Sequence, residues 1–126
     1  MSDSIARLYQ AVLAARDLDP GRSRTAKLFQ RGTSKMAKKL AEEAIEVAID
    51  AVSGDAHAVV RESADLLYNL VVLWVASDVH PKDVWTEMGR RERLLGIAEK
   101  LPKDGLDASL RRKVVALDRS RMRKRR

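Results

Sequence analysis

The sequence contains no cysteine among its 126 residues, which excludes disulfide bonds, thiol chemistry and any metal site built from thiolate ligands. A reducing cytoplasm is therefore the expected setting. Aromatic residues make up only 4% of the chain while 45% of its residues are hydrophobic, so the core is expected to be mainly aliphatic. With only six glycines and three prolines, the composition suits a helical protein.

Segments that direct a chain to a membrane are also lacking. The N-terminus, MSDSIARLYQ, has no basic region followed by an apolar one, so it is not expected to act as a signal peptide. The longest apolar run, residues 66–76, includes Asn69 and is well short of the roughly 20 residues that a membrane-spanning helix requires. We therefore expect no association with a membrane.

The net charge of +7 is concentrated at one end of the chain. Residues 111–126 hold nine basic residues against Asp118 alone, whereas residues 1–110 hold 16 basic and 17 acidic residues. Nucleic-acid binding is therefore expected, if at all, only through this tail. The simpler interpretation of the tail is a flexible, solubilising end. The expected organisation is one domain over residues 1–105, followed by a basic tail over residues 106–126.

Hydrophobic spacing and capping residues predict an all-α bundle of about four helices and no strand. The expected helices are residues 4–16, a second from an N-cap at Thr33 or Ser34 to about Val52, a third from the N-cap Asp55 to about Ser77, and a fourth from Pro81 to about Glu99. Residues 17–23 have the composition of a turn, and the stretch TAKLF after them fits either a short helical turn or an extended arm.

The third expected helix is apolar nearly all round, as its stretch LLYNLVVLWVA shows. A helix with this pattern is usually covered on more than one side, either inside a bundle or at a subunit contact. In a chain of this size, we expect a homo-oligomer to complete the bundle.

Charged residues of the second expected helix share one face, within an arc of roughly 100°. They are Lys35, Lys39, Glu42, Glu43, Glu46 and Asp50. On the third helix, Glu62 and Asp65 share a face with Asn69. Since the connection near Gly54 is short, the two helices are expected to be antiparallel neighbours, with Glu43 and Glu46 facing Glu62 and Asp65.

Four converging carboxylates repel one another and raise one another's pKa, so a bare cluster would be costly. A divalent cation removes this cost, and Mg²⁺ prefers hard oxygen ligands while keeping positions for water and phosphate oxygens. The alternative interpretation is a solvated charged surface. The apolar run that follows Asp65 immediately argues against that alternative.

The motif E-E-x-x-E at Glu42, Glu43 and Glu46, followed by E-x-x-D at Glu62 and Asp65, resembles the signature of the all-α nucleoside triphosphate pyrophosphohydrolases, the MazG-like superfamily. Within it, the stretches TAKLFQRGTSKMAKKLAEEAIEVAIDA and ESADLLYNLVVLWVASDVHPKDVWTEM are similar to the phosphoribosyl-ATP pyrophosphohydrolases of histidine biosynthesis. The correspondence is nearly continuous in these two stretches and extends as a pattern over most of residues 5–90.

This resemblance implies Mg²⁺-dependent hydrolysis between the α and β phosphates of phosphoribosyl-ATP, which gives phosphoribosyl-AMP and pyrophosphate. It assigns the metal-ligand roles to Glu43, Glu46, Glu62 and Asp65, and leaves Glu42 to orient or deprotonate the attacking water. Metal-assisted hydrolysis needs no protein nucleophile, in keeping with the missing cysteine.

Three lysines are candidates for binding the substrate phosphates. Lys35 and Lys39 precede the acidic motif on the same helix face, although Lys39 can equally pair with Glu43 at i,i+4. Lys27 belongs to the stretch before the second helix, which is expected to close over the substrate.

Two features depart from the resembled family. Asn69 stands where the family often has histidine, on the side of the helix that faces the metal, so it is expected to influence the geometry around the ligands. The ending after Met88 also differs from the family's. These departures leave open a related enzyme that acts on another nucleoside triphosphate.

Overall fold

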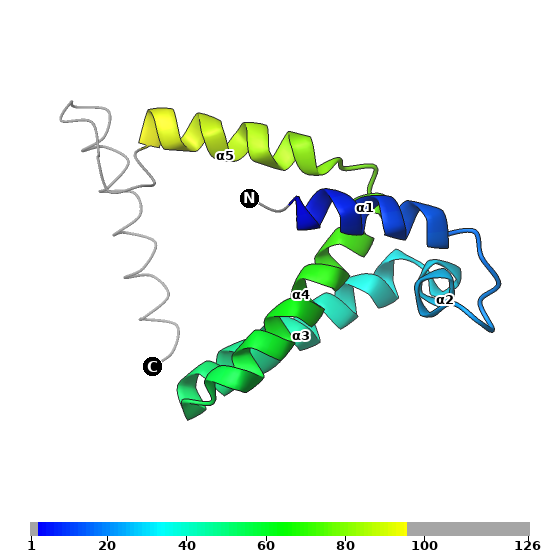
Figure 1. Cartoon of the computed structure of the whole chain (residues 1–126), viewed down its shortest axis with the longest axis horizontal. Coiled ribbons are helices and arrows are strands. Elements are labelled where there is room, and N and C mark those ends of the chain that lie inside the picture. The colour runs from blue at the N-terminus through cyan, green and yellow to red at the C-terminus, as the bar shows by residue number, and fades with distance from the viewer. Residues whose placement is uncertain (1–2, 96–126) are drawn as a thin grey trace. The chain divides into compact units, whose positions relative to one another are not determined.

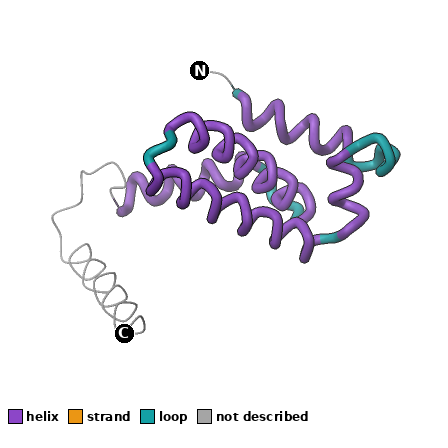
Figure 2. Tube along the Cα trace, turned by 90° about the horizontal axis from the view of Figure 1, so that it is seen from below, coloured by secondary structure: helices purple, strands orange, loops and turns teal. Residues whose placement is uncertain are grey.

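A computed structural model describes residues 3–95, and these residues form five helices and no strand (Figures 1 and 2). The helices are α1 (Ser4–Ala15), α2 (Arg24–Arg31), α3 (Thr33–Ser53), α4 (Ala56–Ala76) and α5 (Pro81–Leu95). The chain divides into two compact units, Met1–Val84 and Trp85–Arg126. The all-α prediction is confirmed, with one helix more than the four expected.

The additional helix is α2, so the helical alternative for the TAKLF stretch is confirmed. Ser23 is its N-cap, and the Ser23 hydroxyl accepts a hydrogen bond of 3.1 Å from the backbone N–H of Ala26. Before it, the Asp19 carboxylate accepts a bond of 3.0 Å from the backbone N–H of Gly21 and closes the turn. Capping of this kind satisfies an N–H that has no partner within the helix.

The predicted N-cap of α3 at Thr33 or Ser34 is wrong, because helical hydrogen bonding begins one residue earlier. The carbonyl of Gly32 already accepts a bond of 3.2 Å from the N–H of Met36, which makes Thr33 the first helical residue. Gly32 has φ 93°, a region that a residue without a Cβ adopts at little cost. The chain can therefore leave α2 and enter α3 through a single residue.

The connection between α3 and α4 consists of Gly54 and Asp55. Gly54 has a left-handed backbone (φ 79°), and its N–H bonds to the carbonyl of Ala51 over 3.2 Å. The Asp55 carboxylate accepts a bond of 3.0 Å from the N–H of Ala58, as an N-cap does. This turn reverses the chain, and the predicted N-cap at Asp55 is confirmed.

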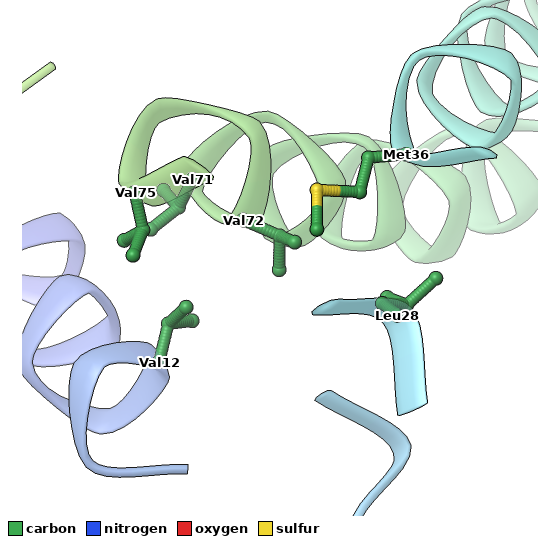
Figure 3. Close-up of a cluster of buried hydrophobic side chains, with 6 residues drawn as sticks. All are labelled: Val12, Leu28, Met36, Val71, Val72 and Val75. Atoms are coloured by element: carbon green, nitrogen blue, oxygen red, sulfur yellow. The ribbon is translucent and has the colours of Figure 1, made fainter. Parts of the chain in front are cut away.

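A cluster of buried aliphatic side chains unites α1, α2, α3 and α4 (Figure 3). Its members are Val12, Leu28, Met36, Val71, Val72 and Val75. The sulfur-bearing chain of Met36 extends from α3 toward Val72 of α4, while Val12 of α1 approaches Val75. Because α3 meets the late part of α4 through Met36 and the early part through Glu43, the two helices are antiparallel. This is the helix pair that the sequence predicted.

The helix α5 begins at Pro81, as predicted, with Asp83 in its first turn. The Asp83 carboxylate accepts a bond of 3.2 Å from the N–H of His80, whose Nδ1 accepts one of 3.1 Å from the N–H of Lys82. These reciprocal bonds fix the start of the helix. The predicted end of this helix near Glu99 lies outside the described residues, as does the basic tail over residues 106–126.

Several aliphatic side chains of α3 and α4 are exposed. The exposed fractions of Ile45, Ile49, Val52 and Val60 are 59%, 58%, 91% and 69%. Burial of such side chains is worth about 1.5–3 kcal/mol each, so their exposure is costly in water. Within residues 3–95, no helix is sufficiently long and apolar to cross a membrane.

Candidate metal centre

The antiparallel α3–α4 pair brings three carboxylates together. One oxygen each from Glu43 of α3 and from Glu62 and Asp65 of α4 lie within 4.8 Å of one another. Glu62 and Asp65 are three residues apart, so one helix face presents both of them to Glu43. The convergence expected from the sequence is therefore present for these three residues.

Glu43 is the most deeply buried acid of this group, with 7% of its surface exposed. Lys39 lies one turn earlier, and its Nζ is 3.6 Å from Glu43 Oε1. The other oxygen, Glu43 Oε2, is buried and has no hydrogen-bond partner, and the same holds for Glu62 Oε2. A buried oxygen without a partner costs about 1–3 kcal/mol, more if it is charged, so this cluster has capacity for a further cation or proton.

The pKa of Glu62 is raised from 4.5 to about 7. The main cause is the neighbouring Glu46 carboxylate and then that of Glu43, either of which favours a protonated Glu62 as a hydrogen-bond donor, followed by burial and by the negative charge of both neighbours. Each of these effects favours the neutral form of Glu62. A group with this electrostatic character, placed among other acids, is typical of functional sites.

The donor set fits a hard divalent cation. It consists of carboxylate oxygens alone, two of which are buried and unpartnered, and it lies between facing helices as metal sites in bundles do. Oxygen-only ligands suit Mg²⁺, Ca²⁺ or Mn²⁺ better than metals that prefer thiolate or imidazole. Glu43, Glu62 and Asp65 are the residues that would hold such an ion.

The other two acids of the motif have different surroundings. Glu46 is exposed and lies outside the group of three, although its carboxylate is the largest cause of the raised pKa of Glu62. Glu42 is also exposed, and we find for it no hydrogen bond or ion pair within residues 3–95. The geometry thus places Glu46 beside the three converging acids, and it does not join Glu42 to them.

The three candidate lysines are on two helices. Lys39 is paired with Glu43, while Lys35, one turn earlier on α3, is partly buried and makes no ion pair with any described residue. Lys27 is exposed on α2. The i,i+4 pairing of Lys39 with Glu43 that the sequence allowed is therefore present. The use of Lys39 in phosphate binding stays a prediction.

Asn69 is almost completely buried, with 1% of its surface exposed. Its Nδ2 donates a bond of 2.8 Å to the backbone carbonyl of Asp65, one turn earlier on α4. Beside it, the Tyr68 hydroxyl lies 2.6 Å from the Thr25 hydroxyl of α2. No pattern in the sequence predicted this second contact, which joins residues 43 positions apart.

The described residues are all helical, and an antiparallel helix pair brings Glu43 of the E-E-x-x-E motif to both acids of the E-x-x-D motif, an arrangement of the all-α pyrophosphohydrolases of the MazG-like type. Comparison with known families agrees with this class. The family Phosphoribosyl-ATP pyrophosphohydrolase matches residues 6–92, well over half of the sequence. The chain belongs to that family.

Relatives with high identity carry matching names. The chain is 67% identical to "Phosphoribosyl-ATP pyrophosphatase 2" of Bradyrhizobium diazoefficiens, over 99% of both sequences. It is 77% identical to the protein of the same name from Rhodopseudomonas palustris, over 82% of this chain and 79% of that one. A "Phosphoribosyl-ATP pyrophosphatase" of Granulibacter bethesdensis is 53% identical, over 75% of this chain and 59% of the relative.

Proposed function

We propose that the protein hydrolyses phosphoribosyl-ATP between its α and β phosphates, with Mg²⁺ as cofactor, and releases phosphoribosyl-AMP and pyrophosphate in histidine biosynthesis. The observation that carries this proposal is the convergence of Glu43, Glu62 and Asp65 in a chain of this family. The proposed setting is the cytoplasm, because the substrate is a nucleotide of biosynthetic metabolism.

In this proposal Glu43, Glu62 and Asp65 hold the metal, and Glu46 completes the set from the next turn of α3. A bound Mg²⁺ supplies charge stabilisation on the phosphate oxygens and activation of water. The unpartnered oxygens of Glu43 and Glu62 support the assignment, because they lack the partner that a cation provides.

The remaining residues act on the substrate or support the ligands. Lys35, Lys39 and Lys27 neutralise charge on the triphosphate, and Lys35 has no carboxylate competing for it among the described residues. Asn69 fixes the backbone at Asp65 through its hydrogen bond and so limits movement of that ligand. Glu42 orients or deprotonates the attacking water, the role that the family resemblance assigns to it.

A second copy of the chain is proposed to cover the exposed aliphatic face of α3. Ile45, Ile49 and Val52 recur at intervals of three and four residues, as they do on one face of a helix. Two such helix pairs packed together complete a four-helix bundle. The homo-oligomer that the sequence predicted is thus supported by the exposed aliphatic face of α3.

The test is release of pyrophosphate in Mg²⁺ buffer from phosphoribosyl-ATP and from a panel of common NTPs and dNTPs. We expect strong preference for phosphoribosyl-ATP, and growth of a histidine auxotroph that lacks this step when the protein is expressed in it. Preference for another nucleotide together with failed complementation would show a related enzyme with a different substrate.

A further inference from the structure

Two successive residues at the start of α2 contact Tyr68 of α4 in different ways. The Thr25 hydroxyl is 2.6 Å from the Tyr68 hydroxyl, in a partly buried hydrogen bond between residues 43 positions apart. The Arg24 guanidinium carbon lies 5.2 Å from the centre of the Tyr68 ring, a distance typical of a cation–π contact. The ring and the hydroxyl of one tyrosine thus fix the beginning of α2.

Tyr68 lies directly beside the candidate metal ligands. It follows Asp65 by three residues, a spacing that places two Cβ atoms about 5–6 Å apart on a helix. Its neighbour Asn69 bonds to the backbone of the same Asp65. Tyr68, which contacts Arg24 and Thr25, is therefore one helical turn from the candidate ligand Asp65.

The group has unused capacity to bind an anion. Thr25 and Tyr68 have one O–H each, and their mutual bond uses one of these, so the other O–H is free to donate elsewhere. Arg24 is exposed and forms no ion pair with any described residue. Its planar guanidinium can offer two parallel N–H donors to a phosphate. Contact with the ring limits the rotamers of Arg24 and lowers the entropy cost of binding.

We propose that Arg24, together with the free hydroxyl of the Thr25–Tyr68 pair, binds the phosphate monoester on the phosphoribosyl part of the substrate. This proposal rests on the proposed function, since that substrate carries two separate anionic groups. The triphosphate is accounted for by the carboxylate-bound cation and the lysines of α3. The monoester has no metal of its own and needs a cation away from the acids, and Arg24 is such a cation on a different helix.

The test compares Arg24→Gln with Arg24→Lys, and uses Arg22→Gln as the matched control. Arg22 is also an exposed arginine, located in the turn before α2. On phosphoribosyl-ATP we expect Arg24→Gln to raise KM about 10- to 100-fold with kcat little changed, because a charged hydrogen bond is lost. Arg24→Lys recovers part of this loss, and Arg22→Gln has the KM of the wild type.

Binding of the two product-like nucleotides identifies the phosphate. Phosphoribosyl-AMP has the monoester on its phosphoribosyl group and AMP lacks it, so calorimetry with both isolates that group. We expect Arg24→Gln to weaken phosphoribosyl-AMP binding and to leave AMP binding unchanged, and Tyr68→Phe and Thr25→Val to weaken phosphoribosyl-AMP binding several-fold.

Two results would overturn the assignment. One is a KM for Arg24→Gln equal to that of Arg22→Gln, and the other is equal weakening of AMP and phosphoribosyl-AMP binding. Failure of the proposed function is a separate result, because it is observed in the wild type as the lack of pyrophosphate release from phosphoribosyl-ATP.

Discussion

Glu43 and Glu62 face each other across the α3–α4 pair, and each has one buried carboxylate oxygen that no hydrogen bond satisfies. Two such oxygens in one place create a local excess of negative charge that a proton or a cation relieves. A proton and the proposed metal ion would therefore compete for one position. The site can therefore be tested by measurements of protein stability, which do not require enzymatic activity.

The first prediction concerns the pH dependence of stability without metal. The pKa of Glu62 is about 7 in the folded protein, whereas its ordinary value is 4.5. Between pH 4.5 and 7 the folded state therefore holds a proton that the unfolded chain has released. This stabilisation is complete below pH 4.5 and is lost as the pH rises through 7. We expect the urea midpoint, measured with a chelator present, to fall over that range.

Glu62→Gln is the comparison for this measurement, because a neutral amide of similar shape replaces the carboxyl group. We expect the fall in the urea midpoint between pH 4.5 and 7 to become shallower in the variant. An unchanged slope would mean that another group causes the pH dependence.

The second prediction is that Asp65→Asn removes metal binding while the helices stay folded. Changing a residue that only supports a metal ligand typically costs about 10- to 100-fold in activity. Loss of the charged ligand itself is expected to lower kcat by more than about 100-fold. We expect Mg²⁺ to raise the Tm of the wild type and to leave the Tm of Asp65→Asn unchanged. Glu92→Gln, an exposed acid of α5, is the control for charge alone. A wild-type response to Mg²⁺ in the Asp65→Asn variant would contradict the ligand assignment.

The third prediction concerns the exposed aliphatic face of α3. Ile49 is 58% exposed on α3, and Ile49→Lys is expected to shift the protein from a homo-oligomer to a monomer in sedimentation equilibrium, because a charge cannot be buried there without a partner. Leu18→Lys is the matched control, since Leu18 is 56% exposed but lies outside α3 and α4. If both variants associate as the wild type does, this face is not the subunit contact.

The fourth prediction tests the core. Met36 is 2% exposed and packs with Leu28 and Val72, so Met36→Ala is expected to lower the free energy of unfolding by about 2–5 kcal/mol. Denaturant unfolding measures this change. A loss below about 0.5 kcal/mol, the range typical of exposed positions, would contradict the packing described for α3 against α2 and α4.

Local features of the sequence predicted much of this fold. The N-cap Asp55 and the helix start at Pro81 depend on residues within a few positions of each other, so their chemistry is visible in the sequence. The convergence of Glu43 with Glu62 and Asp65 was also predictable, because helical periodicity and a short turn fix which faces meet.

Contacts that depend on tertiary packing were not predictable in the same way. The Thr25–Tyr68 bond requires α2 to be held against the bundle by the burial of Ala26 and Leu28, which no local pattern specifies. Glu46 follows Glu43 by three residues on the same helix, yet it is exposed and lies outside the group of three, a difference that helical spacing alone does not predict. The predicted N-cap of α3 was wrong because the helix begins after Gly32, which has no side chain to form a cap and enters the helix through its positive φ.

The two-residue turn at Gly54 and Asp55 has a consequence for how relatives are identified. One residue added to either helix between Glu43 and Glu62 would rotate the later acids by about 100° relative to the earlier one. Such a chain would contain every ligand residue and yet be unable to bring them together. The number of residues that separates the two acidic motifs is therefore as much a part of the site as the acids themselves, and a search pattern that lets this number vary freely would accept sequences that cannot form it.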